Sequence, residues 1–166
     1  KDTQDHFAWQ TSWGASWRLI GALIMVHGDD KGLIIPPKVA PIQVIIIPIY
    51  KDKDKEIVKS SADKLYIELK KSGIRAHVDK RDEYTSGWKF NEWEMKGVPL
   101  RVNIGPRDIE KHQVELVRRD MKNKILVDRG QLTEHVISLL DQIQSNLLNR
   151  AKKLLEDNIT KTTNYD

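Results

Sequence analysis

The sequence contains no cysteine. Disulfide bonds and thiolate metal sites are therefore excluded, and the composition fits a reducing compartment. The five histidines are scattered along the chain, and no two of them are four residues apart, so no metal-binding motif is visible. We expect a cytoplasmic protein without a metal site of its own.

Long apolar runs are also missing. Arg18, His27 and Gly28 bound the longest candidate, which is shorter than the roughly 18 residues that a membrane span requires. No basic region followed by a small-residue cleavage site opens the chain, so we expect neither a signal peptide nor contact with a membrane. The first residue is not methionine and the chain opens in a strand-like segment, which indicates a fragment of a longer protein.

Length and charge set wide limits. A chain of 166 residues with 39% hydrophobic content has room for one domain and part of another. Lys and Arg number 28 against 24 acidic residues, for a net charge of +4. This mild excess of positive charge is consistent with RNA binding and does not by itself establish it.

The middle of the chain predicts an α/β domain. The nearly continuous β-branched run 42–49 indicates a central strand that is covered on both faces, with Pro48 near its end. Apolar residues on one face of 54–72 predict a helix that Gly73 ends, and the alternation in 74–78 predicts a second strand. This β-α-β unit should be parallel and right-handed.

The following elements complete the domain. We expect a short helix over 88–96, strands around 100–104, 114–116 and 124–127, and a long amphipathic helix over 132–154. The order βαβαββα predicts an α/β sandwich, in which helices flank a mixed five-stranded sheet within residues 41–155. Arg107 and Asp108 are expected in a structural turn, and residues 156–166 form a polar tail.

The opening segment reads as a strand, a tight turn and a helix. Asp5 to Trp13 is expected to be a strand, and Ser16 is a suitable N-cap residue for the helix that follows. Residues 19–26 are apolar almost all round, which is typical of a buried helix. At the start of such a helix, the Arg18 guanidinium and the free backbone N–H groups would point toward a phosphate.

Six segments, in this order and at this spacing, resemble those of prolyl-tRNA synthetases of the archaeal and eukaryotic cytosolic type. The resemblance runs from about Phe7 to about Leu155. The segments are Thr11-Ser-Trp-Gly14 followed by Arg18, Val26-His-Gly-Asp29, Pro36-Pro37, Gly87-Trp-Lys-Phe90, Glu94-Met-Lys-Gly-Val-Pro99 and Gly105-Pro-Arg-Asp108.

The resemblance implies that residues 1–40 are the strand-helix end of an antiparallel class II catalytic domain, with its third signature motif. Arg18 would then contact the triphosphate of ATP, which is used with Mg²⁺, and Ser12, Trp13 and Gly14 would line the pocket for proline and its adenylate. Trp17 stands where the family has a small hydroxylated residue, and its indole would either occlude the pocket or point into the core. The family's first two motifs are missing here, so this chain alone should be inactive.

The resemblance also implies that residues 41–155 bind the anticodon of tRNA(Pro), in a parent enzyme that is a homodimer. Proline anticodons carry two guanines, whose N7 and O6 acceptors suit Arg81 and Lys89, while their N–H donors suit Asp79 or Glu94. An ion pair between Asp79 and Arg81 across a turn is an equally open interpretation. All of these residues follow the second strand, where α/β sheets bind their ligands.

The aromatic residues of the same region divide between two roles. Phe90 is open between a base-stacking and a structural role, whereas Trp88 and Trp93 are expected in the core.

Three functions remain open at this point. The favoured one is part of a proline–tRNA ligase, which activates proline with ATP and transfers it to tRNA(Pro). The alternatives are a non-catalytic RNA-binding module derived from a synthetase and an α/β interaction domain without a nucleic-acid role. Threonyl-, histidyl- and glycyl-tRNA synthetases share this type of domain, and segments 11–14 and 87–90 favour the prolyl enzyme.

Overall fold

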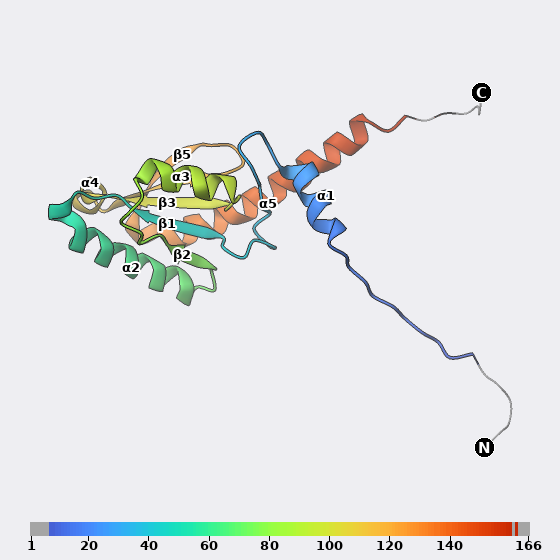
Figure 1. Cartoon of the computed structure of the whole chain (residues 1–166), viewed down its shortest axis with the longest axis horizontal. Helices are drawn as coiled ribbons and strands as arrows, with labels where there is room; N and C mark the ends of the chain where they lie inside the picture. Colours follow the sequence, from blue (N-terminus) through green and yellow to red (C-terminus); the bar gives the residue numbers. More distant parts are fainter. Residues whose placement is uncertain (1–6, 161, 163–166) are drawn as a thin grey trace, which may run out of the picture.

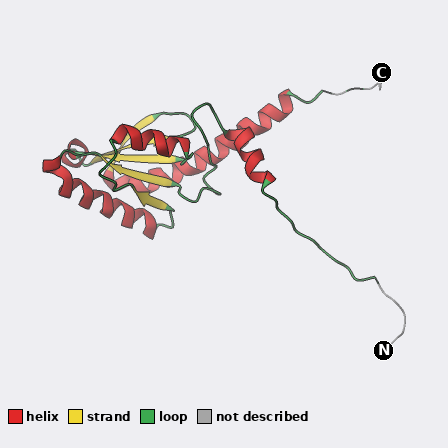
Figure 2. Ribbon diagram, in the orientation of Figure 1, coloured by secondary structure: helices red, strands yellow, loops and turns green. Residues whose placement is uncertain are grey.

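The computed structural model describes residues 7–160 and 162. Its centre is one sheet with the strand order β2-β1-β3-β4-β5 (Figures 1 and 2). β1 is parallel to β2 and β3, whereas β3–β4 and β4–β5 are antiparallel. The predicted mixed five-stranded sheet is therefore confirmed. The strands are β1 (Val44–Pro48), β2 (Ala76–Val78), β3 (Leu100–Ile104), β4 (Gln113–Arg118) and β5 (Lys124–Asp128).

The helices follow the predicted order, with one addition. The five-residue helix α4 stands where the sequence predicts only a turn; Pro106 is its first residue, and Asp108 Oδ2 accepts a hydrogen bond from the Gly105 amide at 2.9 Å. The helices are α1 (Arg18–His27), α2 (Lys55–Lys71), α3 (Ser86–Met95), α4 (Pro106–Glu110) and α5 (Leu132–Asp157), with short 3₁₀ turns η1 (Asp52–Asp54) and η2 (Arg129–Gln131). None of the helices in the described part of the chain has the length and apolarity to span a membrane.

The two faces of the sheet are covered unequally. α2 and α5 pack on one face and enclose the main core, in which Ile46, Leu65, Leu116 and Val136 are fully buried. α3 packs on the other face over β1, where Ile45 and Ile47 contact Trp93 and Val98. Figure 1 shows α3 in front of the sheet and α5 passing behind it. Every residue of β1 is buried, as the apolar run predicts for a central strand.

Beyond α3, the same face carries polar side chains on β3, β4 and β5. Arg101 and Asn103 alternate with buried apolar residues along β3, and Glu115 lies opposite Asn103 on β4. Leu126 and Lys124 on β5 are exposed. We call this part of the sheet the open face.

The connector between α1 and β1, residues 28–43, is attached to the domain by specific contacts. Arg119 is buried, and its guanidinium donates to both carboxylate oxygens of Asp29 (2.9 and 2.6 Å) and to the carbonyl of Glu94 (2.9 Å). Ile34 packs against two residues of α5. Gly97, which follows α3, has a φ of 73°, and a Cβ there would meet the connector's Leu33 at 2.6 Å, so only glycine fits.

The opening segment differs from the prediction. Residues 5 and 6 lie outside the described part of the chain, and residues 7–16 form no strand, because no neighbouring strand among the described residues pairs with them. α1 forms as a helix and Gly28 follows it, but Trp17 rather than Ser16 is the N-cap residue, and it makes no side-chain cap. No residue of α1 is buried. The expectation of a buried helix that supports Arg18 is wrong for this chain.

Candidate functional site

Arg101 is a cation in an unusual position, on a central strand of the sheet. Its guanidinium carbon lies 4.0 Å from the centre of the Phe90 ring, which is a cation–π contact. Its Nε is buried and has no hydrogen-bond partner. A buried donor without an acceptor costs about 1–3 kcal/mol, so Arg101 is held in this position at a cost in stability.

Among the described residues no carboxylate forms an ion pair with Arg101, and the acidic groups act on its charge from a distance. Burial lowers its pKa from the usual value, and the carboxylates of Glu94 and Glu115 act in the opposite direction. An arginine side chain stays protonated in proteins, so the site holds a desolvated positive charge. Such a group favours a ligand that brings hydrogen-bond acceptors.

Asn103 supplies the complementary acceptor. Its Nδ2 donates to Glu115 Oε2 at 2.7 Å, and its Oδ1 is buried without a partner. Within the described residues only three buried side-chain polar atoms lack a partner, and two of them, on Arg101 and Asn103, are adjacent on one face of β3. The third is Nδ1 of His27, at the end of α1. The polar stripe of β3 therefore holds a buried unpaired donor and a buried unpaired acceptor side by side.

The predicted residues Phe90 and Glu94 lie at this site. They are one helical turn apart on α3, on the flank that faces Arg101. The hollow beside Arg101 is lined by Glu94, Val117 and Lys122 among others. The Glu94 carboxylate lies 3.7 Å from Lys31 Nζ and is partly exposed.

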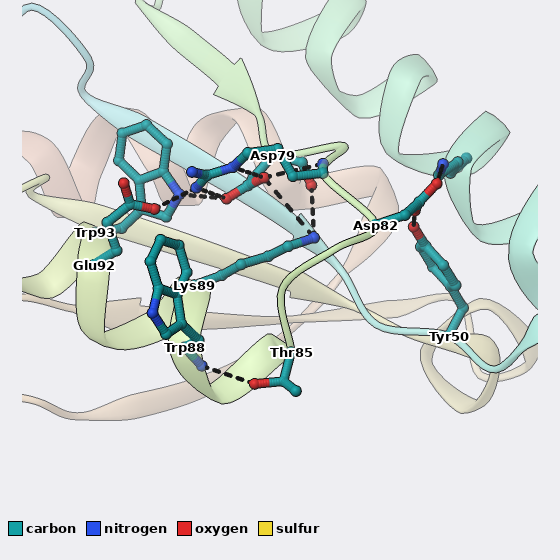
Figure 3. A network of polar contacts seen from close by, with 10 residues as sticks. Tyr50, Asp79, Asp82, Thr85, Trp88, Lys89, Glu92 and Trp93 are labelled. Carbon is teal, nitrogen blue, oxygen red and sulfur yellow. Dashed lines mark hydrogen bonds and ion pairs between the residues drawn. The ribbon is translucent and has the colours of Figure 1, made fainter.

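Asp79, Arg81 and Lys89 are also brought together, on the other side of α3. Asp79 is only 2% exposed, and both of its carboxylate oxygens accept hydrogen bonds from Arg81, at 2.9 and 2.7 Å. Trp93 Nε1 donates to the same carboxylate at 2.8 Å, and Lys89 Nζ lies 3.8 Å from it (Figure 3). The structure thus contains the Asp79–Arg81 ion pair that the sequence left open. Trp93 is in the core, as predicted.

This network is electrostatically saturated. Burial alone would raise the pKa of Asp79, but the hydrogen bonds from Arg81 and Trp93 outweigh it and hold that pKa well below its usual range. Arg81 also donates to Glu92, and Lys89 is 3% exposed. The three predicted base readers therefore fasten the end of β2 to α3, and Asp79, Arg81 and Lys89 are engaged with one another.

The predicted catalytic and substrate residues lie elsewhere. Ser12, Trp13, Gly14 and Arg18 are all exposed, in the segment that extends away from the domain in Figure 1. The Trp17 side chain is exposed too and does not point into a core.

Arg101 is the residue that sequence reasoning did not select. The signal is present in the pattern Leu100-Arg-Val-Asn-Ile104, where charged and amide side chains alternate with apolar ones in a strand at the centre of the sheet. A polar stripe in that position indicates an uncovered face.

A sheet face that combines an aromatic ring, a cation and unpaired hydrogen-bonding groups is typical of domains that read single-stranded RNA. The family of the anticodon binding domain matches residues 43–139, which is more than half of the chain. The chain therefore belongs to the anticodon-binding domain family.

Three curated relatives extend this result to the whole chain. It is 54% identical to the proline–tRNA ligase of Natranaerobius thermophilus over 166 residues, which are 100% of the chain and 34% of that protein. It is 49% identical to the proline–tRNA ligase of Cenarchaeum symbiosum (99% and 35%) and 48% identical to the cytoplasmic proline–tRNA ligase of Arabidopsis thaliana (98% and 31%). The chain spans about a third of the length of these relatives.

Proposed function

We propose that this chain is the anticodon-reading part of a proline–tRNA ligase, together with a segment of its catalytic domain. Support comes from relatives of that name that match the chain from end to end, and from the family of its α/β domain. The activity of the whole enzyme would be the ATP-dependent activation of proline and its transfer to tRNA(Pro).

The observation that carries the proposal is Arg101, a desolvated cation with an unpaired donor, seated on Phe90 beside the Glu94 carboxylate. Guanine presents N7 and O6 acceptors that suit arginine, and N–H donors that suit a carboxylate. One of the two guanines in a proline anticodon could use this set. Phe90 would then hold the Arg101 guanidinium in place through the cation–π contact.

Asp79, Arg81 and Lys89 take a positioning role in this proposal. Their network fixes α3 on the sheet and so fixes Phe90 and Glu94 relative to Arg101. Removal of the network should therefore weaken RNA binding indirectly, through a loss of stability.

We propose the division of the chain that the sequence predicts. Residues 1–40 would end a class II catalytic domain, 41–155 would bind the anticodon, and 156–166 would lead to a further domain. Ser12, Trp13 and Gly14 would line the pocket for proline and its adenylate, and Arg18 would bind the ATP phosphates with Mg²⁺, once the rest of that domain surrounds them. The parent enzyme would be a cytoplasmic homodimer, and the Arabidopsis relative named cytoplasmic supports that location.

The test is the binding of a fluorescent anticodon stem-loop that carries the guanine pair. Arg101→Ala should weaken binding about 5-fold to 150-fold, because one arginine–guanine pair contributes about 1–3 kcal/mol. Arg150→Ala is the matched control, since it removes the same charge from an exposed site on α5. Equal affinities of the two variants would overturn the assignment of the open face.

The same assay separates sequence reading from general attraction. Parent affinity should drop when either guanine is replaced by adenine, and the drop at one of the two positions should shrink in Arg101→Ala. A stem-loop with both guanines replaced should bind the parent and the variant alike. Affinity should also decrease as salt rises, because neutralised phosphates release counterions.

A further inference from the structure

α3 separates two sets of side chains. Phe90 and Glu94 lie on the flank that faces Arg101, whereas Trp88 begins the opposite flank, because two residues on a helix are about 200° apart. The prediction that Trp88 lies in the core is wrong: it is 42% exposed. This second flank has no part in the site on the open face.

Trp88 forms a stacked aromatic pair with Tyr84, which comes from the loop after β2. The two ring centres are 3.8 Å apart and the planes meet at 10°, so the rings are stacked. The Arg81 guanidinium carbon lies 5.0 Å from the Tyr84 ring centre and 5.3 Å from that of Trp88. Tyr84 is 39% exposed and Trp88 42%, so the pair keeps exposed ring surface on the side away from the stack, which a planar ligand can cover.

Polar contacts position the groups around this pair before any ligand binds. Arg81 is held by the carboxylates of Asp79 and Glu92, and the Thr85 hydroxyl accepts from the Trp88 amide at 3.3 Å, as Figure 3 shows. A preformed surface loses little conformational entropy on binding, which favours affinity.

A polar cleft adjoins Tyr84 at the carboxyl ends of β1 and β2. The chain leaves β1 for α2 on one face of the sheet and leaves β2 for α3 on the other, so the two loops diverge and open the cleft. Lys55, Arg81 and Lys89 are among its lining residues, together with Asp52 and Asp82. Asp82 is already paired: Lys55 Nζ and Lys59 Nζ each lie 2.9 Å from its Oδ2, and the Tyr50 hydroxyl donates to Oδ1.

We propose that the stacked pair of Tyr84 and Trp88, with Arg81 beside it, forms a stacking platform whose outer ring face receives one single-stranded nucleotide of the anticodon loop, outside the guanine pair. The inference rests on the proposed function, since it requires the same RNA. A base at Arg101 cannot also cover Trp88 across the helix, so the platform receives a neighbouring nucleotide. Every base has a π-face, so the platform adds affinity without selecting sequence.

The first test measures the same stem-loop with ring-deleting variants. Trp88→Ala and Tyr84→Ala should each weaken binding about 5-fold to 150-fold, which corresponds to the roughly 1–3 kcal/mol of one stacked base. Trp88→Phe should retain most of the affinity, because a ring remains. Trp9→Ala is the matched control, since Trp9 is exposed and lies in the segment before α1. Thermal unfolding of each variant shows that the fold is kept.

The second test finds the nucleotide. Abasic sites are placed one at a time along the loop, and the loss caused by Trp88→Ala is measured with each RNA. The loss should vanish at one position outside the guanine pair and persist when either guanine is abasic. Loss that vanishes at an abasic guanine instead would overturn the platform as described.

The two proposals fail in different ways. If Trp88→Ala and Tyr84→Ala bind like the parent while Arg101→Ala binds weakly, the platform is wrong and the anticodon assignment stands. If the parent does not prefer the guanine-containing loop, the proposed function fails and the platform fails with it.

Discussion

α1 and β1 are both apolar segments, but they differ in how far they are buried. All five residues of β1 are buried, whereas no residue of α1 is. β1 has a parallel strand on each side and helices on both faces of its sheet. α1 meets the rest of the described chain mainly at α5, where Arg150 donates to the His27 carbonyl at 3.2 Å. An apolar composition indicates that a segment needs a covering surface, but it does not identify which part of the protein covers it.

This contrast fits the proposed function. A helix with exposed Leu19, Ile20, Ile24 and Met25 presents an apolar surface of the kind that marks a contact with other protein. In a ligase about three times as long as this chain, the remaining catalytic domain would supply that contact. The α/β domain completes its own core within residues 34–147 and does not need it.

The sharpest test of the contrast is one substitution made in both regions. Ile46→Ala should lower the free energy of unfolding by about 4 kcal/mol, because a fully buried side chain leaves a cavity. Ile20→Ala removes the same atoms from a residue that is 51% exposed, and it should change the free energy of unfolding by less than about 0.5 kcal/mol. Urea unfolding followed by circular dichroism measures both. Similar losses would mean that α1 is packed in solution.

A smaller effect is expected from the ion network of the α/β domain. Asp79→Ala should cost about 3 kcal/mol, because it leaves Arg81, Lys89 and the Trp93 N–H without their acceptor. Asp63→Ala breaks an exposed pair with Lys80 and should cost less than about 1 kcal/mol.

The pH dependence of the unfolding free energy tests whether the contribution of Asp79 comes from its charge. The pKa of Asp79 is depressed in the folded state, so its contribution is full above the unfolded value of about 3.9 and is lost as the pH falls through the folded pKa. The difference in unfolding free energy between the parent and Asp79→Asn should be constant from about pH 7 to 5 and shrink below about pH 4. A difference that does not change down to pH 2 would assign the effect to packing.

The sequence predicts the order of elements here because each long element carries its own period. β1 and α2 show the apolar run and the helical spacing over enough residues to be recognised. α4 is missed because five residues are too few to show a helical period.

Contacts between distant residues were harder to predict. Trp93 and Asp79 are fourteen residues apart, and only the packing of α3 on the sheet brings the indole N–H to the carboxylate. Trp88 and Trp93 look alike in the sequence, yet their positions around α3 place one at the surface and one in the core. The sequence shows Arg101 as a polar residue in a strand. Its importance depends on α3 covering β1 and leaving the polar side chains of β3 beside it, and no local pattern predicts which strands a helix covers.

The smallest effect should come from removing the opening segment altogether. A chain that starts at residue 28 loses α1 and the hydrogen bond to the His27 carbonyl, and it keeps both the Asp29–Arg119 pair and buried Ile34. Its unfolding free energy should stay within about 0.5 kcal/mol of the parent, and binding of a dye that reports exposed apolar surface should decrease. A chain that starts at residue 39 is the control: it leaves Arg119 buried without its carboxylate and removes Ile34 from α5, so it should be several kcal/mol less stable. If the shorter truncation alone costs more than about 2 kcal/mol, α1 belongs to the domain's core and the contrast between the two regions does not hold.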